Sequence, residues 1–205
     1  MSGLRPQHVL PLLILLATSS ACGSDGDVDE AVDPAGSTTS SPALEAITPQ
    51  GVAAVVRDAL GADRIVSYSA AGESDSVGVM VELEGRQRLV VNVQIEGEVP
   101  IGSCEDLSET AMGVADCVTD EDGTITASGS AEAFSDDNTR GSTVLAQSVN
   151  PETERVVYAL YETYSPRAGL DAAGLAAIVS DPALAAMTEP ATNEAGSDIE
   201  FTDAN

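Results

Sequence analysis

The sequence of 205 residues contains no Lys, no Trp and a single His, His8. Eight Arg stand against 34 Asp and Glu, which gives a formal net charge of −26 at pH 7. A charge of this sign repels nucleic-acid phosphates and anionic lipid headgroups, so we expect no nucleic-acid partner. Hydrophobic residues still make up 43% of the chain, too many for a wholly disordered acidic protein. These figures predict one globular domain with polar ends.

The missing residue types also restrict catalysis. If residues 1–21 are removed as a signal, His8 leaves with them, and the mature chain has neither His nor Lys. Such a chain cannot use a Ser-His-Asp or Cys-His mechanism, a Schiff-base lysine or a His-ligated zinc site. It also lacks a glycine-rich phosphate loop. We therefore expect no catalytic residue, no metal site and no cofactor.

Paired carboxylates remain a possible route to catalysis, because they hydrolyse glycosidic bonds without His. A small secreted carboxylate-dependent glycosidase is therefore the main alternative. Sugar-cleaving clefts usually offer aromatic platforms, and the patterned part of the chain has few aromatic residues. They are Tyr68, Phe134, Tyr158, Tyr161 and Tyr164.

The first 22 residues have the three parts of a secretory signal. Arg5 supplies a positive start, residues 9–17 form a short apolar run, and residues 18–22 are small. The apolar run is shorter than the roughly 20 residues needed to span a bilayer. We expect removal of residues 1–21 and no transmembrane helix in the mature protein.

The end of this segment resembles the lipobox of bacterial lipoproteins, in which a Cys that follows small residues receives a lipid. Ser20 and Ala21 match the pattern, whereas Ser19 stands where an aliphatic residue is usual. The resemblance implies a lipidated (palmitate-bearing) Cys22 that anchors the protein to the extracytoplasmic face of the cell membrane. Ordinary signal peptidase could cut the same bond and release a freely secreted protein with an unmodified Cys22. Abundant Ala, Gly and Asp without Lys also resemble the proteins of high-GC actinobacteria.

The other two cysteines, Cys104 and Cys117, lie 13 positions apart in the patterned region. Disulfides persist in secreted proteins, and neither cysteine has a CxxC partner, so we predict a disulfide between them. Closing a loop of this size would stabilise the fold by about 3 kcal/mol.

Composition predicts the boundaries of the fold. Residues 22–47 hold a cluster of acids among Gly, Ser, Thr and Pro, which is typical of a flexible tether after a lipidated Cys. Residues 188–205 are acidic and lack any cation, and we expect a disordered tail there. Residues 48–187 are expected to form a single domain.

Within that region, local patterns predict an α+β fold. Thr48 and Pro49 are typical of a helix start, and Gly61 of its end. Alternating apolar residues predict strands, and Asp171 can cap a second helix. The expected strands cover residues 65–70, 77–83, 89–95, 115–119, 124–128, 143–149 and 155–164. We expect an antiparallel sheet of about 6–7 strands with an N-terminal and a C-terminal helix on one face, stapled by one disulfide.

Two features of the sequence could bind a ligand. Residues 120–123, Asp-Glu-Asp-Gly, resemble the middle of a calcium-binding EF-hand loop, but the end ligands would be Val118 and Gly129, so we favour a plain hairpin turn. Residues 136–138 are interpreted as an exposed loop, and any Ca²⁺ binding as weak and nonspecific. Tyr158 and Tyr164 fall on one strand face and Tyr161 on the other; a Tyr on an open face could bind a peptide or glycan, but we favour packing.

The sequence thus predicts a non-catalytic, membrane-anchored extracytoplasmic lipoprotein that binds an envelope protein or another envelope ligand of unknown specificity. A carrier-type chaperone domain for lipids or peptides, with a cavity over the bare sheet face, is a third possibility.

Overall fold

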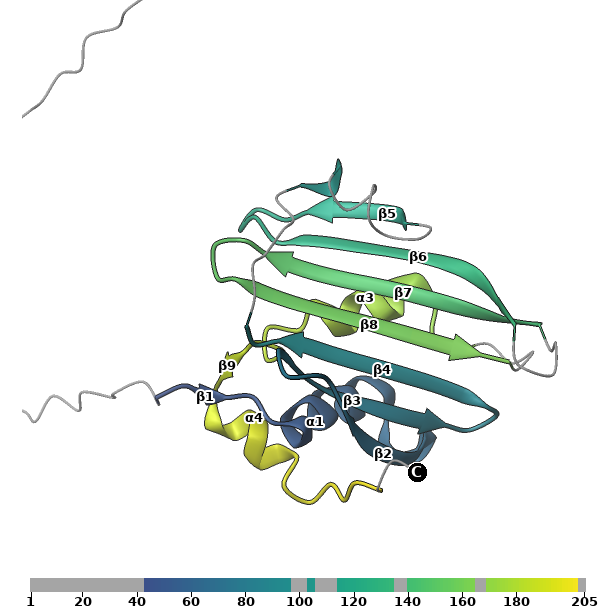
Figure 1. Cartoon of the computed structure of the whole chain (residues 1–205), viewed down its shortest axis with the longest axis horizontal. Coiled ribbons are helices and arrows are strands. Elements are labelled where there is room, and N and C mark those ends of the chain that lie inside the picture. Colours follow the sequence, from purple (N-terminus) through teal and green to yellow (C-terminus); the bar gives the residue numbers. More distant parts are fainter. Residues whose placement is uncertain (1–42, 97–102, 106–113, 135–139, 165–168, 203–205) are drawn as a thin grey trace, which may run out of the picture. The chain divides into compact units, whose positions relative to one another are not determined.

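A computed structural model describes residues 43–96, 103–105, 114–134, 140–164 and 169–202. Seven antiparallel strands form one sheet in the order β2-β3-β4-β8-β7-β6-β5, and helices lie against it (Figure 1). The strands are β2 Ile65–Ala71, β3 Ser76–Leu83, β4 Gln87–Gln94, β5 Val114–Thr119, β6 Ile125–Phe134, β7 Arg140–Asn150 and β8 Arg155–Thr163. The predicted α+β fold is confirmed.

The first helix, α1 (Pro49–Leu60), forms where its local signals place it. Thr48 Oγ1 accepts the backbone N–H of Gly51 at 3.1 Å, and Gly61 ends the helix with a φ of 83°. A positive φ of this size favours glycine because it has no Cβ. A turn of 3-10 helix, η1 (Ala62–Arg64), leads from α1 into β2.

The period-two pattern of the strands determines which face meets the helices. Val79, Val81, Leu89 and Val91 are all fully buried and belong to the main hydrophobic cluster together with residues of α1 and of α3 (Ala172–Val179). Helix α1 contacts β2, β3 and β4, while α3 contacts β6, β7 and β8. Both helices thus cover one face of the sheet, which confirms the predicted layering.

Arg155 at the start of β8 fastens the end of α3 to the sheet. Its guanidinium donates to the backbone oxygens of Val179 at 2.7 Å, Asp181 at 2.6 Å and Leu184 at 2.7 Å, and to Ser148 Oγ at 3.0 Å. Burial lowers the pKa of Arg155. The side chain thus serves as a packing and bonding element of the fold.

The prediction of a disordered tail from residue 188 was wrong for residues 188–202. Strand β9 (Met187–Thr188) pairs with β1 (Glu45–Ala46), and helix α4 (Pro190–Ala195) packs on α1. Ile199 is buried, and Phe201 packs edge-on against Tyr68. Residues 188–202 are ordered by contacts with residues that are distant in the sequence. The sequence pattern does not reveal them, because β9 and α4 are too short to show a hydrophobic period.

Asn193 of α4 joins both ends of the described chain. Its Oδ1 accepts from the backbone N–H and the hydroxyl of Thr48, each at 3.0 Å, and its Nδ2 donates to Ala46 O at 2.9 Å. Ile47 is buried in the main cluster, so the fold also starts before the expected residue 48. Arg57 adds bonds to Asp198 at 3.1 Å and to Ala195 O at 2.7 Å.

The predicted disulfide between Cys104 and Cys117 is present. Both cysteines pack against a second, smaller hydrophobic cluster. Its buried members are Ile125, Ala127, Val149 and Val156. Because Val156 alternates with the helix-facing Val157, this cluster lies on the sheet face opposite α1 and α3.

Candidate functional site

Cys22, the predicted lipidation site, lies outside the described residues, as do residues 136–138. Cys104 and Cys117 are joined as a structural disulfide. None of the helices in the described ranges is long and apolar enough to cross a membrane.

Residues 120–123 form the turn between β5 and β6, which confirms the hairpin interpretation. Asp122 Oδ1 accepts the backbone N–H of Thr124 at 3.0 Å, and this bond lowers the pKa of Asp122. Gly123 has a φ of 79°, which suits its place in the turn. Within the part of the chain that the structure describes, no three His, Cys, Asp or Glu side chains gather as metal ligands.

The tyrosines divide between the two faces of the sheet. Tyr161 is fully buried on the helix-covered face, and its hydroxyl donates to Gln87 Oε1 at 2.6 Å. Packing, as predicted, accounts for this residue. Tyr158 lies on the opposite face and is 41% exposed, so packing accounts for it less well.

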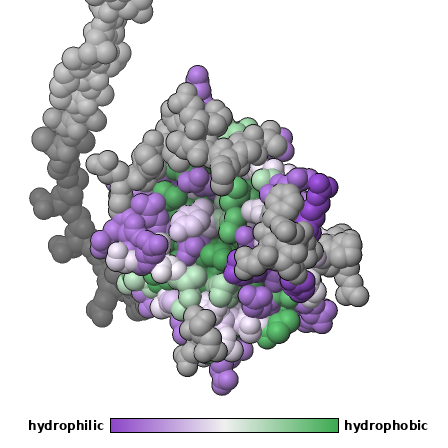
Figure 2. Space-filling view, turned by 45° about the vertical axis from the view of Figure 1, so that its right-hand side comes forward, coloured by the Kyte–Doolittle hydropathy of each residue, from purple (hydrophilic) through white to green (hydrophobic). Residues whose placement is uncertain are grey.

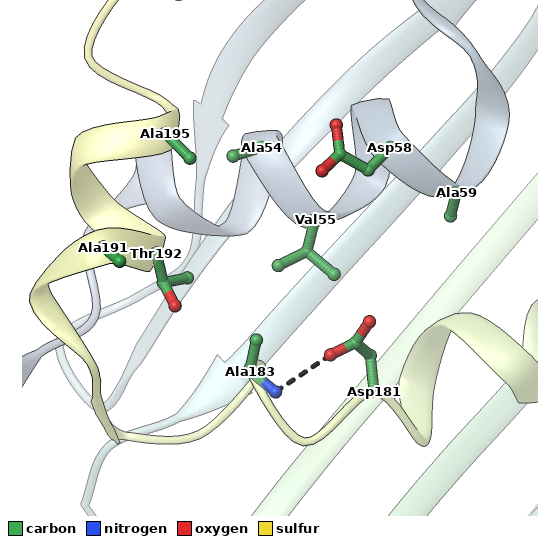
Figure 3. A pocket seen from close by; sticks show the side chains of 9 residues that line it. All are labelled: Ala54, Val55, Asp58, Ala59, Asp181, Ala183, Ala191, Thr192 and Ala195. Carbon is green, nitrogen blue, oxygen red and sulfur yellow. Dashed lines mark hydrogen bonds between the residues drawn. The ribbon is translucent and has the colours of Figure 1, made fainter.

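A pocket of about 500 Å³ lies between α1, α4 and the loop after α3 (Figure 3). Most of the residues that line it are small and apolar: Ala54, Val55, Ala59, Ala183, Ala191 and Ala195. The polar lining residues are Asp58, Asp181 and Thr192. Asp58 and Asp181 extend into it from opposite walls, and Asp181 Oδ1 accepts the backbone N–H of Ala183 at 2.9 Å (Figure 3). These carboxylates can accept hydrogen bonds, but the lining offers no aromatic platform for a sugar ring.

A second hollow of about 540 Å³ lies where the turns β5–β6 and β7–β8 meet the segment after α3. Asp120, Asp122 and Glu154 give it acidic walls. Its Arg155 donates to backbone oxygens, and its Asn150 donates to Thr124 Oγ1 at 2.9 Å. Both of these side chains are therefore bonded within the protein rather than held ready for a ligand.

The sheet face opposite α1 and α3, here called the far face, carries a row of aliphatic side chains across four strands. Met80 pairs with Val90, Val90 with Leu160, and Leu160 with Leu145. These four residues, the aliphatic row, are partly exposed, and none of them packs in either hydrophobic cluster of the described residues. A solvated sheet face normally alternates to polar residues, so a partly exposed aliphatic row at its centre departs from that pattern.

Asn92 lies in the register row beside the aliphatic row, between Gly78 and Tyr158. The residue is only 5% exposed, and its Oδ1 is buried without a hydrogen-bond partner in the described part of the protein. Gly78 makes this position possible, because a Cβ there would collide with Asn92 Oδ1. A buried carbonyl oxygen without a donor costs about 1–3 kcal/mol, so this acceptor needs an explanation.

The row on the other side of the aliphatic row is charged. Arg88 pairs in register with Glu82 on β3 and with Glu162 on β8, and its guanidinium forms an ion pair with Glu162. This bond raises the pKa of Arg88, so the cation is charged throughout the physiological range. We call these three residues, Glu82, Arg88 and Glu162, the charged border. With two carboxylates and one guanidinium, the charged border has one excess negative charge.

Comparison with protein-family models, curated proteins and solved structures gives no match. The functional interpretation therefore rests on the geometry of the chain itself.

The strand alternation in the sequence predicts a sheet face without helices, but it does not single out the residues that distinguish this face. The alternation of β3 and β4 places Met80 and Val90 on the face away from the helices α1 and α3. The strand pattern places Asn92 on the same face as Met80 and Val90, and only the structure shows that it is buried beside Gly78. The signal that could have revealed it is the glycine inside a strand, which marks a close approach.

Proposed function

We propose that this chain is a lipid-anchored extracytoplasmic binding module without catalysis, and that it holds a protein partner of the cell envelope. Cys22 carries the anchor, and the acidic stretch after it serves as the tether. The lipobox-like residues Ser20, Ala21 and Cys22 support the anchor, and the Cys104–Cys117 disulfide suits an oxidising compartment.

The observation that carries the binding proposal is the aliphatic row on the far face. Hydrophobic residues also reach the surface between hydrophilic ones in Figure 2. A monomer would gain solubility from polar residues at these four positions, whereas a protein interface uses apolar residues at its centre and polar ones at its rim. The absence of His and Lys from the mature chain supports a non-catalytic role.

The anchor is tested by mass spectrometry of the mature N-terminus in the membrane fraction. We expect a diacylglyceryl mass on Cys22 and release of the protein from membranes by Cys22→Ser. Unchanged membrane association of Cys22→Ser contradicts the anchor.

The binding role is tested by cross-linking in intact envelopes with the anchored chain as bait. We expect one or a few envelope proteins captured in proportion to the bait, and the same proteins lost when Leu160→Glu places a charge on the aliphatic row. A screen on cell-wall polysaccharides in parallel addresses the glycosidase alternative: turnover that a single Asp or Glu substitution abolishes overturns the non-catalytic proposal.

A further inference from the structure

We infer that the aliphatic row is the docking site of a basic amphipathic helix from a partner protein. This inference rests on the proposed function and adds the chemistry of the partner to it. Three properties of the far face support it: the length of the row, the unpartnered oxygen of Asn92, and the sign of the surrounding charge.

The length of the row suits a helix. Met80 and Leu145 are separated by three strand-to-strand steps, which amount to about 14 Å. Three turns of α-helix cover about 16 Å, so a helix laid across the strands places about four apolar side chains along the row. The opposite face of the same sheet is already covered by two helices, α1 and α3.

Asn92 adds a requirement for a hydrogen-bond donor. Residues two apart along a strand are separated by about 7 Å, so a helix about 10 Å wide centred on the row reaches the neighbouring row as well. There Asn92 Oδ1 is the buried acceptor without a partner among the described residues, with the exposed Tyr158 beside it. Because Asn92 Oδ1 is closed to solvent in the free protein, the Asn92 side chain has to turn toward the docked helix, where a Lys or Arg on the flank supplies such a donor.

The charge of the face determines the sign of the partner. Glu82 and Glu162 outnumber Arg88 on the charged border, and the chain as a whole carries −26. A second copy of this chain would bring the same excess of negative charge to the face, which opposes self-association. A helix with basic flanks meets attraction on the charged border and provides the donor that Asn92 lacks.

The test uses the full chain carrying Cys22→Ser, secreted through an oxidising compartment. The probes are three labelled synthetic peptides of about 18 residues, long enough to cover the row. The first has a Leu stripe with Lys and Arg flanks, the second has the same stripe with Glu flanks, and the third is the first one scrambled so that no stripe remains. Fluorescence anisotropy at about 0.15 M and about 0.5 M salt separates docking from general attraction. We expect the first peptide to bind at least about tenfold more tightly than the others at both salt concentrations.

Variants of the face then locate the binding. Val90→Thr together with Leu160→Thr should weaken binding of the first peptide at least about tenfold, because both lose aliphatic contact area. Val118→Thr is the matched control, since Val118 is 60% exposed on the other side of the sheet. If the double variant does not fold by circular dichroism, Met80→Thr replaces it.

Asn92→Leu removes the acceptor and keeps the side-chain size. We expect about tenfold weaker binding without loss of thermal stability, because the exchange also removes an unsatisfied group. If Asn92 had only a structural role, Asn92→Leu would change the thermal stability and leave the affinity for the first peptide unchanged. That result would overturn the proposed role of Asn92 in binding.

The remaining outcomes separate this inference from the proposed function. Equal binding of all three peptides, or binding that the row variants leave unchanged, refutes the helix site. If Leu160→Glu abolishes the envelope cross-links but the three peptides bind equally, the binding role stands and only this inference fails. A concentration-dependent dimer of the free chain that the row variants abolish shows that a second copy occupies the face, which also refutes the inference.

Discussion

Replacing Arg155 with Met tests how the segment that begins with α3 is held to the sheet. The guanidinium donates to three backbone oxygens, those of Val179, Asp181 and Leu184, at 2.6–2.7 Å. These oxygens end α3 and start the segment toward β9. A methionine side chain at this position would fill similar space but donate nothing. The oxygens of Val179 and Leu184 would lose the guanidinium, and the oxygen of Asp181 would keep only the backbone N–H of Leu184 at 3.0 Å.

The expected cost follows from these bonds. A hydrogen bond from a charged donor contributes about 1.5–3 kcal/mol, and bonds that share one donor do not add fully. Burial of the guanidinium lowers the pKa of Arg155. The desolvation of this cation offsets part of the free energy that its hydrogen bonds contribute. We therefore expect Arg155→Met to lower the free energy of unfolding by about 3–4 kcal/mol, and Arg155→Lys by about half as much, since an ammonium cannot reach all three oxygens.

Urea unfolding followed by circular dichroism measures both values. The matched control is Arg64→Met, because Arg64 is exposed and its side chain bonds to nothing in the described part of the chain. The control should change the free energy of unfolding by no more than about 0.5 kcal/mol. Hydrogen exchange should show that the amides of α3 lose protection first in Arg155→Met. If Arg155→Met unfolds at the same urea concentration as Arg64→Met, the reasoning from these bonds is refuted.

Three further predictions concern the ends of the fold, the disulfide and acid stability. Truncation after residue 187 should remove at least about 3 kcal/mol of stability or prevent folding, because it deletes buried Ile199 and the brace of α4 on α1, whereas a disordered tail would change nothing in a thermal melt. Replacing both Cys104 and Cys117 with Ser should cost about 3 kcal/mol in denaturant unfolding, and an unchanged midpoint would contradict a stabilising role. The bond from Arg57 lowers the pKa of Asp198, so its stabilisation is present at neutral pH and is lost as the pH falls through that lowered value. Asp198→Asn should therefore flatten the acid limb of the stability profile between pH of about 5 and 2, and an identical limb would contradict the assignment.

Local signals were sufficient where the structure depends on neighbours in sequence. Thr48 and Gly61 bracket α1, and Asp171 caps α3 by accepting from the backbone N–H of Gly174 at 2.8 Å. The alternation of the strands predicted the sheet because its period is a property of the backbone. Residue types alone therefore predicted the fold class, most element positions and the disulfide.

Long-range contacts account for what the pattern missed. Helix α4 has six residues and no apolar stripe, and it is held by Asn193 and by the Arg57–Asp198 pair, whose partners lie more than 140 positions apart. The burial of Asn92 depends on a glycine in the adjacent strand, a juxtaposition that needs the register of β3 on β4. Tertiary contacts of this kind leave no periodic trace in a single sequence.

Because the chain has few cations, we ask what the bonded arginines in the described part of the protein do for the fold. Arg57 joins α1 to the end of α4, Arg155 joins the end of α3 to the sheet, and both donate to backbone oxygens. The forked guanidinium serves several acceptors at once, which a lysine ammonium cannot do as well. These arginines therefore bind segments together rather than neutralise the surface. On the far face, Glu82 and Glu162 outnumber Arg88, so the partner that we infer for that face would gain by being basic.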